Sequence, residues 1–77
     1  MKKLTIEYIP VSQAKPHSKN PRKHSKKQVE QIAASIRQFG FTAPVLVNAE
    51  YQLIAGHGRV LAAQQLGMEN IPVVMLD

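Results

Sequence analysis

The residues with the clearest chemical capacity are Gly56, His57, Gly58 and Arg59, which lie between two apolar stretches. Glycine tolerates backbone angles that other residues avoid, and it lets a ligand approach the main chain closely. A helix start offers unpaired N–H groups and a partial positive charge, to which Arg59 adds a planar set of donors. Together these features predict an anion site, with phosphate as the preferred ligand.

The same turn also has a simpler interpretation, in which the glycines only shape the chain and the arginine is solvated. Its spacing differs from that of two known phosphate loops. No Gly-Lys-Ser/Thr follows, as a Walker-type loop requires, and Leu61 stands where a dinucleotide fingerprint needs glycine or alanine. The spacing alone therefore leaves both interpretations open.

A second candidate site is a basic segment. The formal net charge is +5, and no acidic residue lies between Glu7 and Glu30. Thirteen residues of this stretch carry six of the basic side chains, namely Lys15, Lys19, Arg22, Lys23, Lys26 and Lys27. A block of one sign predicts a polyanionic partner such as nucleic acid, and the alternative is a solvated arm.

Several chemistries are excluded by composition. The chain has no cysteine, so disulfides and thiolate catalysis are absent. The spacing of His17, His24 and His57 matches no zinc pattern, and we expect no metal site in the protein itself. No apolar run approaches transmembrane length, and Glu7 and Pro10 interrupt any signal-like stretch. We expect a cytoplasmic protein without membrane contact.

The elements that position these residues follow from hydrophobic periodicity. Alternation over residues 4–9 predicts a half-buried strand with Leu4, Ile6 and Tyr8 on its apolar face. Residues 11–24 have no period and predict a loop. A capping box at Ser25 then predicts a helix that ends at Gly40.

The second half of the chain predicts three strands and a helix. Residues 45–47 and 51–54 are expected to pair as a hairpin, and a helix is expected over Val60–Leu66. The last strand covers residues 71–76, where Pro72 should lie at the first position or on a free edge. This order predicts a small α/β domain with a mixed sheet and two main helices.

Several segments together resemble the ParB/sulfiredoxin superfamily, and more closely the ParB-like N-terminal domain, often labelled a ParB-like nuclease domain. The segments are Asn20-Pro21-Arg22, Ser35 to Gly40, Pro44 to Val47, and Tyr51 to Arg59 with its glycine turn. The resemblance runs from about Ile6 to Asp77 and implies one domain over residues 1–77. Because a core strand ends directly before Asp77, we expect this domain to be the front of a longer protein.

The resemblance implies that the glycine turn holds the phosphates of a nucleotide. By residue, Gly56 and Arg59 carry over, while His57 and Gly58 replace the glutamate and first arginine that are typical of the family. Two further positions, Asn20 and Arg22, carry over to a nucleotide- or DNA-facing surface. The implied cofactor is CTP or ATP with magnesium, and the implied partners are DNA for the full protein and a second copy in a homodimer.

Enzymatic alternatives stay open within the same superfamily. Sulfiredoxin activity is excluded because the chain lacks cysteine. The sequence from Gly56 to Arg59 is similar to the Gly-His-His-Arg of free serine kinases, with His57 as base or phosphate ligand. No local carboxylate is available to hold magnesium, so we expect no turnover by the 77-residue chain itself. A nuclease or nucleotide hydrolase in the full protein, or a nucleic-acid interaction module without a nucleotide site, are the remaining alternatives.

Overall fold

The computed structural model describes residues 4–15 and 25–76, which form four strands, two α-helices and one short 3-10 helix. In chain order they are β1 (Ile6–Pro10), η1 (Val11–Gln13), α1 (Lys26–Phe39), β2 (Val45–Val47), β3 (Leu53–Ala55), α2 (His57–Gln65) and β4 (Asn70–Met75). This order confirms the predicted α/β arrangement. Within the described residues, neither helix is long and apolar enough to cross a membrane.

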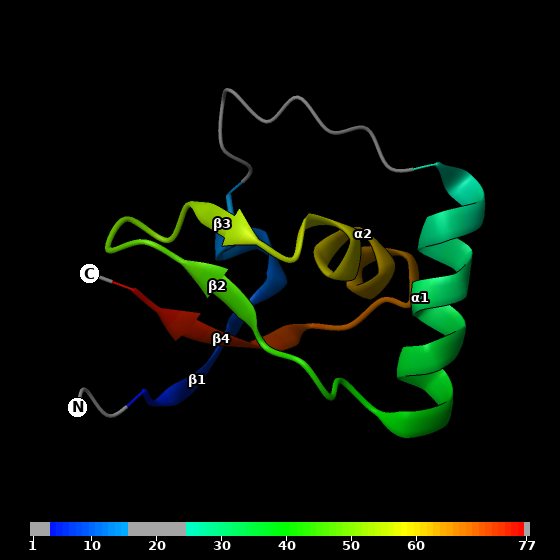
Figure 1. The fold of residues 1–77 in the computed structure, drawn as a ribbon, viewed down its shortest axis with the longest axis horizontal. Helices are drawn as coiled ribbons and strands as arrows, with labels where there is room; N and C mark the ends of the chain where they lie inside the picture. The colour runs from blue at the N-terminus through cyan, green and yellow to red at the C-terminus, as the bar shows by residue number, and fades with distance from the viewer. Residues whose placement is uncertain (1–3, 16–24, 77) are drawn as a thin grey trace.

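The sheet is mixed, as predicted, with the strand order β1-β4-β2-β3. Strand β4 is antiparallel to β1 and parallel to β2, and β2 forms an antiparallel pair with β3. Helix α2 packs against the sheet, and α1 packs against α2 on the side away from the sheet (Figure 1). The helices therefore form two successive layers over the sheet.

Two apolar clusters hold these layers together. The larger one joins the sheet to α2 through fully or almost fully buried side chains such as Val45, Val47, Val60 and Ile71. The smaller one joins the two helices and centres on Val29, Ala33 and Ala62. Helix α2 contributes to both clusters, which explains why its sequence carries no charge after Arg59.

Helix α1 begins with the predicted capping box. The side chain of Ser25 accepts from the Gln28 N–H at 3.1 Å, and the Gln28 side chain accepts from the Ser25 N–H at 3.2 Å. The helix ends at Gly40, whose φ of 83° lies in the region that favours glycine. Helical spacing places Phe39 on the same face as Val29 and Ile36, yet Phe39 is 67% exposed. The apolar cluster between the two helices includes Val29 and Ile36 but not Phe39.

The predicted face of the first strand is wrong. The side chain of Ile9 is buried, whereas Leu4, Ile6 and Tyr8 are 65, 55 and 71% exposed. Side chains alternate between the two faces of a strand, and α2 covers the face to which Ile9 belongs. Apolar residues do alternate along the strand, but the larger set, Leu4, Ile6 and Tyr8, faces solvent.

The predicted place of Pro72 is also wrong, because this residue is the third of β4, a central strand. Pro72 lies opposite Tyr8 in the ladder with β1. The ladder with β2 begins one residue later, at Val73. Pro72 is thus paired on one side alone, and its missing N–H interrupts no hydrogen bond between β4 and β2.

The turn of the β2–β3 hairpin is fixed by Asn48, whose side-chain oxygen accepts from the N–H groups of Glu50 and Gln52, both at 2.9 Å. Tyr51 has a positive φ of 62° and its hydroxyl donates to a carboxylate oxygen of Glu7 at 3.0 Å. This hydrogen bond, together with partial desolvation and the charge of Glu7, raises the pKa of Tyr51 above its usual value near 10.0.

Candidate functional site

The candidate turn joins β3 directly to α2, and the helix begins at His57, one turn earlier than the predicted Val60. Gly56 makes this possible because it adopts a left-handed conformation, with φ of 101° and ψ of 23°. Its carbonyl accepts from the Val60 N–H at 3.0 Å. The N–H groups of residues 57–59 therefore belong to the first turn, where a helix offers donors that it cannot satisfy itself.

Gly56 is also required by packing. A Cβ atom built on it would lie 2.6 Å from Cγ1 and 2.9 Å from Cβ of Val45, and 3.2 Å from Nη2 of Arg59. These distances show that Val45 of β2 and the Arg59 side chain both lie so close to Gly56 that a larger residue would clash. Gly58 is buried and His57 is partly buried, so the turn is a packed part of the fold.

The Arg59 side chain is only partly exposed, which differs from the solvated arginine of the simpler interpretation. Its Nη2 donates to the carbonyl oxygen of Pro44 at 3.4 Å, a long hydrogen bond. Its Nε is buried and has no hydrogen-bond partner among the described residues. A guanidinium has five N–H donors, so most of its hydrogen-bonding capacity is left for a ligand.

Arg59 forms one wall of a cavity of about 230 Å³. The other walls come from the second half of α1 and from the connector that leads to β2, and the lining residues are Ile32, Ser35, Ile36, Gly40, Phe41, Thr42, Ala43 and Arg59. The cavity combines apolar side chains, two hydroxyl groups and one cation. Such a mixture suits a small organic anion that has a flat or apolar part.

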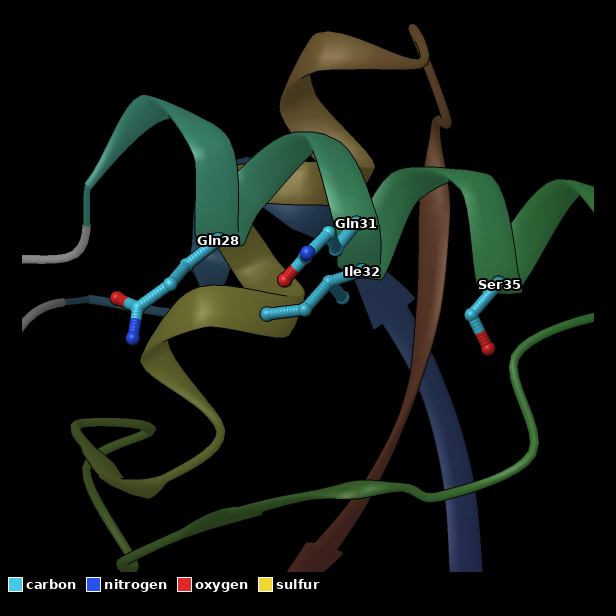
Figure 2. Close-up of a pocket in the computed structure, with 4 residues that line it drawn as sticks. All are labelled: Gln28, Gln31, Ile32 and Ser35. Carbon is cyan, nitrogen blue, oxygen red and sulfur yellow. The ribbon is translucent and has the colours of Figure 1, made fainter.

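A wider and more open hollow of about 430 Å³ lies along α1 and shares Ile32 and Ser35 with the cavity. It is lined by Gln28, Gln31, Ile32 and Ser35. The side chains of Gln28, Ile32 and Ser35 project from the same side of the helix (Figure 2). The hollow therefore continues the cavity along α1 and adds amide and hydroxyl groups to its lining.

Sequence reasoning missed the α1 part of this site. Ser35 belongs to one of the segments that carry the family resemblance, and nothing in the sequence predicted that Thr42 would contribute to a site. One signal was present, because Gln28, Ile32 and Ser35 have spacings of four and three residues and must share a helix face. Nothing in the sequence indicated that the Pro44 carbonyl would accept a hydrogen bond from Arg59.

The structure describes only some residues of the predicted basic segment. Lys15, Lys26 and Lys27 are exposed, the last two in the first turn of α1, which carries no acidic residue. Lys15 is held through its main chain, since its N–H donates to the Tyr51 carbonyl at 3.0 Å. The remaining predicted positions, Lys19, Asn20, Arg22 and Lys23, lie outside the described residues. No group of three His, Asp or Glu side chains able to hold a metal occurs in residues 4–15 and 25–76.

A sequence profile described as the ParB N-terminal domain matches residues 1–77, the whole chain. The chain is 48% identical over 75 residues to the ParB-like nuclease domain-containing protein YnaK of Escherichia coli (strain K12). This alignment covers 97% of the chain and 86% of that relative.

Solved structures share the fold. The C-terminally truncated chromosome-partitioning protein ParB of Caulobacter crescentus, complexed with CTP-γ-S, superimposes with a TM-score of 0.85 at 28% identity, covering 95% of this chain and 44% of that one. The same protein is also known complexed to the centromeric parS site. A free serine kinase in complex with AMP gives a TM-score of 0.80 at 28% identity, covering 99% of this chain and 32% of that one.

Sulfiredoxin from Arabidopsis thaliana has a TM-score of 0.83 at 24% identity, covering 95% of this chain and 85% of that one, and this likeness concerns the fold alone. Together these structures confirm the predicted ParB/sulfiredoxin-like fold class. The chain spans less than half of the partition protein and of the kinase.

Proposed function

The chain belongs to the ParB N-terminal domain family, and from this premise we propose that it is a nucleotide-binding module of a protein that acts on DNA. The phosphates bind at residues 56–59, where the first turn of α2 supplies N–H donors. Arg59 supplies the positive charge.

The observation that carries this proposal is the hydrogen bonding and burial of the Arg59 side chain. Its guanidinium is held by Pro44 and by the packing against Gly56, so its position is set before a ligand arrives. Its Nε is buried and has no hydrogen-bond partner in the described part of the chain. A buried donor without a partner costs free energy, and an anion beside the α2 N-terminus would remove this cost.

The cavity next to Arg59 then receives the base or the ribose. Its apolar walls at Ile32, Ile36 and Phe41 can contact a flat ring, and the hydroxyls of Ser35 and Thr42 can hydrogen-bond to its edge. The proposal is further supported by relatives of similar fold that were solved with CTP-γ-S and with AMP. The choice between cytosine and adenine is an outcome of the experiment.

The action on DNA rests on the similarity to ParB of Caulobacter crescentus, which was solved with parS, and on the exposed lysines at the start of α1. The matched region is less than half of that protein. DNA recognition is therefore proposed for a full protein, with this domain as the part that responds to nucleotide.

Calorimetric titration with CTP, ATP and inorganic pyrophosphate, each with and without magnesium, tests the proposal. We expect one of the nucleotides to bind more tightly than pyrophosphate, because the cavity adds contacts to the base. The substitution Ser35→Leu should weaken nucleotide binding and leave pyrophosphate binding unchanged. A matched control is Ser12→Leu, at an exposed serine of η1 outside the cavity. If no nucleotide and no pyrophosphate bind at millimolar concentration, the proposal is wrong.

A second candidate is phosphoryl transfer to a small molecule. The kinase likeness and the partly buried His57 at the turn favour it. Magnesium-dependent turnover of ATP by the chain would support this candidate over a binding module.

A further inference from the structure

The cavity beside Arg59 is smaller than the usual site for a small organic ligand. Its volume is about 230 Å³, whereas such sites usually measure about 300–1,000 Å³. The open hollow of about 430 Å³ continues it along α1, because Ile32 and Ser35 line both. A nucleotide with its phosphates at residues 56–59 and its ribose in the cavity would therefore place its base at the hollow.

The lining of the hollow suits a nucleobase. Ile32 is partly buried and can contact the flat face of a ring, while the amides of Gln28 and Gln31 can hydrogen-bond to its edge. Gln28 lies seven residues before Ser35, which is about 10 Å along the helix. This separation is comparable to the reach of a nucleoside from its 5′ oxygen to the edge of its base.

The amide of Gln28 has a fixed orientation. Its Oε1 accepts from the Ser25 N–H at 3.2 Å, and a flipped amide would place its NH₂ against that N–H. The capping box therefore turns the Nε2 of Gln28 away from Ser25, and in Figure 2 this nitrogen points away from α1. The Nε2 has no hydrogen-bond partner within residues 4–15 and 25–76. The hollow thus contains a fixed donor.

We propose that the hollow is the base subsite of the nucleotide site, and that Gln28 determines its specificity by donating from Nε2 to an acceptor on the edge of the base. This role rests on the proposed function and adds to it the place of the base and the polarity of its recognition. Bases offer such an acceptor as a carbonyl oxygen or as a ring nitrogen. CTP and UTP have both kinds of oxygen- or nitrogen-bearing edge, whereas adenine has ring nitrogens and no carbonyl.

The substitution Gln28→Glu separates this role from helix capping. Glutamate also completes a capping box, and its charge in the first turn is favourable to the helix dipole, so the melting temperature should be equal or higher. The NH₂ donor is replaced by a carboxylate oxygen, which only accepts. We expect the dissociation constant of the tightest-binding nucleotide to rise about ten-fold. Pyrophosphate, which has no base, should be affected much less.

The matched control is Gln38→Glu, which makes the same change of charge at an exposed residue of α1 outside both the hollow and the cavity. Calorimetric titration of each variant with CTP, UTP, ATP and pyrophosphate measures the effect. The control should change the affinity for nucleotide and for pyrophosphate by the same small factor. A loss with CTP and UTP but not with ATP would identify a carbonyl acceptor, and a loss with ATP would identify a ring nitrogen.

A second measurement needs no substitution. In NMR spectra of the unaltered chain, the side-chain NH₂ signals of Gln28 should shift when nucleotide is added and stay in place when pyrophosphate is added.

Failure of the base subsite and failure of the nucleotide site give different results. If the unaltered chain binds nucleotide and Gln28→Glu changes the affinity no more than Gln38→Glu, the base subsite is wrong and the nucleotide site stands. Equal losses for nucleotide and pyrophosphate in Gln28→Glu, or NH₂ signals that nucleotide leaves in place, would also overturn the subsite. If the unaltered chain binds no nucleotide, both are wrong.

Discussion

Gly56 packs against Val45 so closely that a methyl group on the glycine would lie 2.6 Å from the valine Cγ1. Val45 has no exposed surface and belongs to the central cluster between the sheet and α2. The turn that presents the candidate phosphate site is thus built on the core of the domain, and its shape depends on β2. Gly56 therefore affects both the shape of the candidate phosphate site and the stability of the domain.

Gly56→Ala should strongly destabilise the domain. The left-handed conformation costs a non-glycine residue about 1–2 kcal/mol, and overpacking costs about 1–3 kcal/mol, which together make roughly 2–5 kcal/mol. Urea unfolding followed by circular dichroism measures this loss. Gly40→Ala is the matched control, because Gly40 has a φ of +83° but nothing within 4 Å of a Cβ. Equal losses in the two variants would contradict the packing explanation.

Arg59→Ala should weaken nucleotide or pyrophosphate binding about ten- to a hundred-fold. A charge-assisted hydrogen bond contributes about 1.5–3 kcal/mol. Arg59→Lys should recover part of the loss, since lysine keeps the charge but loses the planar donors. Calorimetry measures the affinity, and Arg37→Ala in the last turn of α1 is the control for net charge.

The same Arg59→Ala variant should melt only slightly below the unaltered chain. It loses the long hydrogen bond to Pro44, which contributes about 0.5–1.5 kcal/mol at most. An unchanged ligand affinity combined with a clearly lower melting temperature would show that Arg59 is structural and would remove the anion site.

Glu7→Gln should lower the pKa of Tyr51 toward its usual value, because the carboxylate that accepts from the Tyr51 hydroxyl is removed. Ultraviolet titration of the phenol measures this change in a Tyr8→Phe background, since the chain has two tyrosines. The raised pKa stabilises the folded state below pH 10, and this contribution is lost as the pH rises through the folded pKa. A Tyr51 pKa that is unchanged by Glu7→Gln would contradict the contact.

Nucleic-acid binding by the basic segment should be weak, independent of sequence and steeply dependent on salt. Each neutralised phosphate of duplex DNA contributes about −0.9 to the slope of log K against log salt, so three contacts give about −3. Lys26→Gln combined with Lys27→Gln should reduce the slope by about 2 if both lysines contact phosphates. Fluorescence anisotropy over a salt series provides the data, with Arg37→Gln as control. A slope near zero removes nucleic acid as a partner of this chain.

The 77-residue chain should not turn over CTP or ATP at a useful rate, because phosphoryl transfer relies on metal ions and positioned groups at the transferred phosphate. Release of labelled phosphate in the presence of magnesium measures this activity. Turnover that disappears in His57→Ala would show that the enzyme candidate is correct.

The sequence by itself determined those features that depend on neighbours along the chain. The capping box at Ser25 and the stop at Gly40 are local hydrogen-bonding or backbone effects, and the structure confirms both. The predicted hairpin is likewise closed by a local turn, in which the Asn48 side chain accepts from the main chain. The glycine turn was also located correctly, because a left-handed residue between a strand and a helix needs glycine. The family resemblance followed from the order of these local segments.

Only the tertiary structure decided which side chains face the core and which groups form the cavity. Both faces of β1 carry apolar residues, so burial of Ile9 rather than Ile6 depends on where α2 packs. Arg59 meets the Pro44 carbonyl across fifteen residues, and Ser35 reaches the same cavity from α1, which packs mainly against α2. Periodicity reports on one element at a time, whereas these contacts result from packing between elements that are distant in the chain.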